Sequence, residues 1–160
     1  MAKKLFSDID YFEGYHLLGI VSQLKDYNLA FNLNNELDID LKKFEDISLC
    51  DNDGNNHSYS WYFYSDETIL AKIYMISNSS GGSKLIPSKK ELDYFLLWKD
   101  FPSEEYILDL LPLIRKIQNV LAVFKFDLNE IKDAEIIIEN IEIHEIENLQ
   151  KIKKEFKSVE

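Results

Sequence analysis

Apolar residues alternate with polar ones through much of the first half of the chain, a spacing typical of β-strands buried on one face. Residues 59–64 alternate most clearly, because Tyr59, Trp61 and Phe63 share one face of the predicted strand. After a short polar turn, Ile69–Ser77 alternates in the same way. The two segments predict one long antiparallel hairpin.

Other segments predict further strands. Residues 16–24 are apolar and include β-branched residues, and Gly19 within them marks a bulge or the close approach of another chain segment. The sequence Asp51–Asn56 is a polar turn that follows another predicted strand. The remaining predicted strands are Phe44–Cys50, Glu91–Trp98 and Leu121–Leu128.

The segment that follows residues 16–24 has two interpretations. Its apolar residues Tyr27, Leu29, Phe31 and Leu33 alternate with polar or small ones. This alternation favours a strand that pairs with residues 16–24. The competing interpretation is a helix capped by Asp26, with Leu29, Leu33 and Leu37 on one stripe. The alternation favours the strand, followed by a short helix over residues 34–43.

Two helices are predicted in the second half. Ser103 is a good N-cap and precedes two glutamates that suit the positive end of the helix dipole. Pro112 should kink this helix or delay its start. Its apolar residues recur at helical spacing: Ile107, Leu110, Leu111, Ile114, Ile117 and Leu121.

The end of the chain predicts an amphipathic helix that forms a tail over residues 139–160. Its expected stripe consists of Ile146, Leu149, Ile152, Phe156 and Val159. We expect this stripe to pack on the sheet, and the alternative is that it binds a protein partner or a second copy. Residues 78–84, rich in serine and glycine, predict a flexible loop.

Together these elements predict a single domain over residues 1–160 of the α+β class. Its mostly antiparallel sheet of about five or six strands packs against one or two helices in two layers. The length of 160 residues is the usual size of one domain with an ordinary core. A hydrophobic fraction of 46% fits a globular protein rather than a disordered one.

The charge and the cysteine content narrow the class of function. A net charge of −11 disfavours nucleic-acid binding and favours solubility. A single cysteine, Cys50, and an amino terminus without a signal sequence lead us to expect a cytoplasmic protein. No apolar run approaches the roughly 20 residues that cross a bilayer, so we expect no membrane insertion.

No set of residues in the sequence predicts a metal site, a cofactor or a catalytic centre. The three histidines, His16, His57 and His144, lack the short spacings of zinc ligands. Cys50 has only His57 near it in sequence, across a turn, and a buried inert thiol is the simpler interpretation. We therefore expect a protein that is not an enzyme.

One segment resembles a known motif. Ile86, Pro87, Asp93 and Tyr94 match, at the right spacing, the pattern that names the IPExxxVDY family of uncharacterised bacterial proteins. Ser88 stands where that motif has glutamate and Leu92 where it has valine. Residues upstream also resemble the family in order, including Gly19, Asp66-Glu67 and Asn78, so the resemblance covers roughly residues 12–138.

The resemblance implies a small cytoplasmic protein without an assigned activity. Our leading hypothesis is a non-catalytic interaction or adaptor domain. One alternative is a module that binds or transforms a small ligand at Asp93, Tyr94 and Trp98. Another is an accessory protein of RNA metabolism, which the resemblance suggests through a gene neighbourhood with ribonuclease III and which would need clustered lysines near Lys89.

Overall fold

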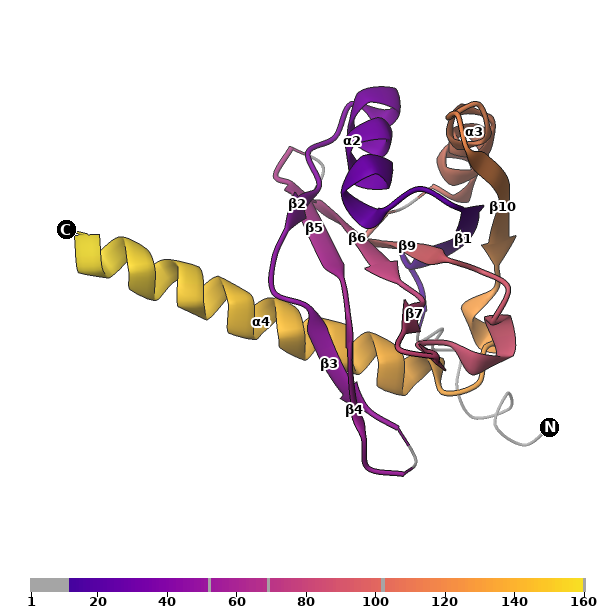
Figure 1. Ribbon diagram of the computed structural model, residues 1–160. Helices are drawn as coiled ribbons and strands as arrows, with labels where there is room; N and C mark the ends of the chain where they lie inside the picture. Colours follow the sequence, from indigo (N-terminus) through magenta and orange to yellow (C-terminus); the bar gives the residue numbers. More distant parts are fainter. Residues whose placement is uncertain (1–11, 52, 69, 102, 160) are drawn as a thin grey trace, which may run out of the picture.

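A twisted six-stranded antiparallel sheet forms the centre of the molecule in the computed structural model (Figure 1). The structure describes residues 12–51, 53–68, 70–101 and 103–159, with the backbone alone for 152–159. The strands lie in the order β10-β1-β9-β6-β5-β2. Their bounds are β1 His16–Ser22, β2 Lys42–Lys43, β5 Trp61–Asp66, β6 Ala71–Ser77, β9 Tyr94–Lys99 and β10 Val120–Phe126.

Two small antiparallel sheets extend this framework. The first pairs β3 (Ile47–Cys50) with β4 (Asn56–Tyr59), and the second pairs β7 (Ser79–Ser80) with β8 (Ser83–Lys84). Two short 3-10 helices, η1 (Pro87–Lys89) and η2 (Leu128–Glu130), lie in the connections. The predicted α+β class and the antiparallel sheet are confirmed.

The three α-helices cover both faces of the sheet. α2 (Asp26–Leu37) and α3 (Glu104–Arg115) pack on one face, and α4 (Ala134–Val159) packs on the opposite face (Figure 1). The described elements therefore form three layers rather than the two that we expected.

Two apolar clusters fill the space between these layers. The first lies under α2 and α3 and includes Leu18, Trp98 and Ile107. The second lies under α4 and contains Trp61, Phe63 and Tyr74, which pack ring against ring. The sheet thus separates two cores, and one tryptophan is fully buried in each.

The first half of α4 holds the helix on the sheet with both apolar and polar groups. Ile138 and Ile141 are buried in the second cluster. One turn further on, Glu145 is 4% exposed and accepts hydrogen bonds from the Tyr74 hydroxyl and, at 2.6 Å, from Lys72 Nζ. Burial, with Glu145 beside it, raises the pKa of Tyr74 far above its usual range, so the phenol is the donor.

The preferred interpretation of residues 27–33 was wrong. These residues belong to α2, in which Leu29, Ala30 and Leu33 face the core while Tyr27 and Phe31 are exposed. The exposed aromatic residues produced the misleading alternation. The competing helix is the correct one, although Lys25 occupies the N-cap position and Asp26 lies in the first turn. No separate helix covers residues 34–43, where α2 ends and β2 follows.

Three further predictions needed correction. The alternating segment 59–64 contains the end of β4 and most of β5, which belong to different sheets. The expected loop 78–84 contains the β7–β8 hairpin. On α4, Ile146 and Leu149 are exposed, while Glu145 and Asn148 occupy the buried stripe. The side chains of Ile152, Phe156 and Val159 lie outside the described residues.

Most other elements are confirmed. β1, the β5–β6 hairpin, β9 and β10 occupy predicted segments, although Ile69 lies outside the described residues. Ser103 caps α3 by accepting a hydrogen bond from the Tyr106 amide at 3.2 Å. Pro112 lies in the last turn of α3, and the helix ends at Arg115, earlier than the apolar spacing indicated.

Candidate functional site

The segment with the motif-like residues is held by one buried asparagine. Asn78 is fully buried, and its side-chain oxygen accepts a hydrogen bond from the Ile86 amide at 2.9 Å. Its side-chain amide donates to the carbonyls of Lys89 and Leu92 at 2.9 and 2.8 Å. Its backbone N–H donates to the Asp93 carbonyl. Asn78 therefore fixes residues 86–93 as one structured turn.

Leu92 fixes this segment against the sheet above Gly19. A Cβ atom added to Gly19 would lie 2.4 Å from Leu92 Cδ1 and 2.7 Å from Phe126 Cε2. The sequence prediction of a close approach at Gly19 is thus confirmed. Lys89 lies over the Phe126 ring, 4.7 Å from its centre. The segment supports β10 from the α4 side of the sheet.

Asp93 and Tyr94 join β9 to the end of β1. Asp93 Oδ2 accepts a hydrogen bond from the Ser22 amide at 2.8 Å, and the Tyr94 hydroxyl donates to the Leu24 carbonyl at 2.7 Å. Burial and the nearby carboxylates of Asp26 and Asp93 raise the pKa of Tyr94 to about 12. Both side chains already use their polar groups within the fold.

Trp98 does not meet Asp93 and Tyr94 in a common cavity. Trp98 lies four positions after Tyr94 along the extended strand β9, a distance of roughly 13 Å. Trp98 is 1% exposed and lines a cavity of about 80 Å³ with Tyr64 and Phe101, but neither Asp93 nor Tyr94 lines it. The structure thus does not bring the three predicted site residues together.

A groove of about 530 Å³ lies between the β3–β4 hairpin and the first turns of α4. Two pairs of its polar side chains bond to one another: the Tyr59 hydroxyl donates to Ser83, and His57 contacts Asp51 at 2.8 Å. The register pairs Cys50 with Asn56 and Leu49 with His57. The Cys50 and His57 side chains therefore point to opposite faces of this hairpin, which excludes a thiol–imidazole pair. Cys50 is exposed rather than buried.

Two of the lysines near residue 89 are engaged within the fold. The ammonium groups of Lys84 and Lys89 contact Ser79 and the Phe126 ring, respectively. Across the described residues, no group of three or more histidine, cysteine or acidic side chains could hold a metal ion. None of the helices within those same residues combines the length and the apolarity needed to cross a membrane.

At its outer edge, β10 has backbone groups that pair with no other strand among the described residues. In the neighbouring strand β1, Ile20 and Ser22 direct their backbone groups toward β9 and away from β10. The Ile20 carbonyl accepts a hydrogen bond from the Asp93 amide, and the Ser22 amide donates one to Asp93 Oδ2. Ile20 lies opposite Val123, so Val123 directs its N–H and carbonyl outward, as does Lys125. The only described contact to these groups is a long one, 3.4 Å, from Arg115 to the Val123 carbonyl.

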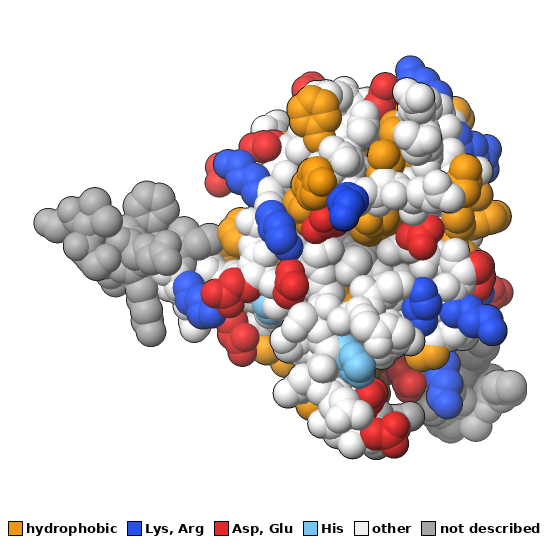
Figure 2. Space-filling view, viewed as in Figure 1, with side chains coloured by type: hydrophobic (Ala, Val, Ile, Leu, Met, Phe, Trp, Pro, Cys, Tyr) orange, Lys and Arg blue, Asp and Glu red, His pale blue; other side chains and the backbone are white. Residues whose placement is uncertain are grey.

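Apolar side chains accompany this edge. Leu121 is 67% exposed and Phe124 is 46% exposed, and Phe124 lies beside the partly buried Phe126. Figure 2, in the view of Figure 1, shows apolar side chains at the right-hand side of the molecule, where α3 and β10 lie. The sequence predicted the strand, but its position at the edge depends on the topology and could not be inferred from the pattern.

Comparisons with known proteins assign no family. No family model matches the chain, and no curated protein matches it. The similarity of residues 86–94 to the IPExxxVDY motif therefore stays a prediction.

Proposed function

We propose that this protein is a non-catalytic interaction domain that binds another polypeptide strand at the β10 edge. The observation that carries the proposal is an edge strand of seven residues with outward backbone groups and two exposed large apolar side chains. Strand addition at such an edge supplies main-chain hydrogen bonds for affinity and side-chain contacts for specificity.

The polar groups elsewhere support this proposal over a small-ligand site. Asp93, Tyr94 and Asn78 are all engaged in bonds that hold the backbone. A ligand site needs a few polar groups that converge on a hollow, and these three groups converge on none of the described cavities. The similarity to the IPExxxVDY motif is consistent with this interpretation, since the motif-like segment supports β10.

The proposal is tested at Lys125, whose outward N–H would donate to an added strand. A proline there removes this donor without removing a bond to β1, so the fold should persist. Lys125→Ala is the matched control, because it also loses the ion pair with Glu104 at 2.8 Å but keeps the N–H. Tagged wild type, Lys125→Pro and Lys125→Ala are purified from the native cell, and bound proteins are quantified by mass spectrometry.

We expect wild type and Lys125→Ala to retain the same stoichiometric companion and Lys125→Pro to lose at least nine-tenths of it. Circular dichroism and thermal unfolding verify that each variant is folded. A companion that folded Lys125→Pro retains in full would contradict binding at this edge.

A further inference from the structure

We propose that the strand that completes the β10 edge is β10 of a second copy of this chain, so that two sheets join about a two-fold axis at Phe124. The inference rests on the proposed function, because it names the partner of the same edge. The register of β10, the sizes of its side chains and the charges along it support this pairing.

The regular part of β10 is centred on Phe124. The register with β1 shifts between Val21 and Ser22, which leaves Leu121 as an extra residue in β10. A bulge of this kind ends regular pairing on its strand. Residues 122–126 remain as the straight edge, and Phe124 is the middle one.

An antiparallel partner that overlaps all five residues therefore places Phe124 opposite the same residue of the second copy. Val123 then lies opposite Lys125 of the other copy, and the reverse pair is equivalent by symmetry. Both residues direct their backbone groups outward, so each pair exchanges two hydrogen bonds. This register satisfies the outward groups of Val123 and Lys125 in both copies.

The side chains fit this pairing. Phe124, an exposed aromatic residue, meets an identical ring across the axis, a contact typical of pairs that do not exchange hydrogen bonds. Phe126 lies opposite Ala122, so the larger side chain meets the smaller one. The exposure of an aromatic residue on an unpaired edge is thereby explained.

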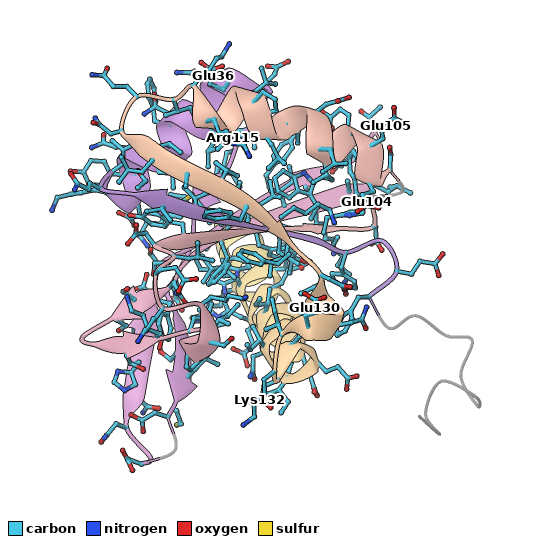
Figure 3. The ribbon with its side chains drawn as sticks, turned by 90° about the vertical axis from the view of Figure 1, so that its right-hand side faces the viewer. Glu36, Glu104, Glu105, Arg115, Glu130 and Lys132 are labelled. Carbon is cyan, nitrogen blue, oxygen red and sulfur yellow. The ribbon has the colours of Figure 1, made fainter. Side chains whose placement is uncertain are left out.

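Charged side chains lie along both halves of β10. Figure 3 faces this edge and shows Arg115 and Glu36 toward one end of β10, with Glu130 and Lys132 toward the other. The Arg115 guanidinium lies 3.4 Å from the Val123 carbonyl, and Glu104 is ion-paired with Lys125 of its own chain. An antiparallel arrangement brings Arg115 of one copy toward Glu104 and Glu130 of its partner. This local attraction opposes the repulsion between two chains of net charge −11.

The first experiment traps the symmetric pair with a disulfide. The native cysteine is removed by Cys50→Ser, and Phe124→Cys is introduced. Residues opposite each other in a pair of this type have Cα atoms about 4.5 Å apart, within disulfide range. Leu121→Cys is the matched control: it is more exposed, yet its copies would lie about 20 Å apart in this register.

We expect mild oxidation to convert most of the Phe124→Cys chain to a disulfide dimer and less than a tenth of the Leu121→Cys chain. Equal cross-linking of both variants would show random collision and overturn the register. Absence of cross-linking at Phe124 would overturn self-pairing at this residue.

The second experiment reverses the charge at the axis. Phe124→Lys and Phe124→Glu each place like charges opposite each other, so each variant alone should dimerise at least tenfold more weakly than wild type. A 1:1 mixture should recover the dimer, because lysine then faces glutamate. Sedimentation from about 1 µM to about 500 µM measures all three samples.

The two proposals fail in different ways. If wild type stays monomeric throughout this range, self-pairing is overturned. If Lys125→Pro then also loses a companion that is a different protein, the β10 edge remains the binding surface. A wild-type dimer that Lys125→Pro leaves intact overturns self-pairing at β10. The proposed function is overturned as well only if folded Lys125→Pro also retains every other companion in full.

Discussion

The two edges of the central sheet differ in length, charge and exposed apolar area. β2 consists of Lys42 and Lys43 alone, and Lys43 forms an ion pair with Asp46 at 2.9 Å. β10 has seven residues with Leu121 and Phe124 exposed. Short strands and lysines are common protection against edge-to-edge association. The chain thus protects one edge and leaves the other suited to pairing.

Among changes near the two edges, replacing the buried Asn78, which supports the β10 side of the sheet, is expected to reduce the free energy of unfolding most. Asn78→Ala leaves the Ile86 amide and the Leu92 carbonyl without their side-chain partner, and it leaves the Lys89 carbonyl with the Leu92 amide alone. We expect a loss of about 4 kcal/mol in the free energy of unfolding, measured by urea denaturation. Asn55→Ala, at an exposed turn, is the control and should change it by less than about 0.5 kcal/mol. Equal effects would refute the supporting role of Asn78.

A smaller effect is expected at Gly19, where the motif-like segment meets the β10 side of the sheet. Gly19→Ala forces a methyl group against Leu92 and Phe126, and we expect a loss of about 2 kcal/mol. Leu92→Val makes room, so the double variant should lose about 1 kcal/mol less than the sum of the single changes. Strictly additive values in urea denaturation would show that the two residues are not coupled.

The smallest effect on stability is expected at the protected edge. Replacing Lys42 and Lys43 together by threonine should change the free energy of unfolding by less than about 0.5 kcal/mol, because both lysines are exposed. The variant should nevertheless form species larger than a dimer at high concentration, as light scattering would show. A variant that associates no further than wild type would mean that charge does not protect β2.

The elements that sequence patterns predicted well are those whose buried residues are apolar. The β5–β6 hairpin is of this kind, as is β1 except for the buried Ser22 at its end, and α3 adds a cap at Ser103. α2 was mistaken for a strand because Tyr27 and Phe31, which contribute to the alternation, are exposed.

The stripe of α4 could not be predicted for a different reason. The buried positions include Glu145 and Asn148, and Glu145 is accommodated only because Lys72 and Tyr74 reach it from β6. A polar residue paired across 71 positions of sequence has no local signature. The candidate site at β10 could not be predicted for the same reason. A strand lies at the edge of a sheet when no other strand pairs with its outer side, and this depends on the arrangement of the whole sheet rather than on the local sequence.

The separation of the core by the sheet gives each half its own intrinsic fluorophore. Trp61 lies against the His144 ring of α4, 4.8 Å between ring centres, while Trp98 lies under α2 and α3. The tryptophan emission of a Trp98→Phe chain would come only from the α4 side, and that of a Trp61→Phe chain only from the other side. Emission spectra of the two chains would therefore report separately on which layer loosens first during denaturation.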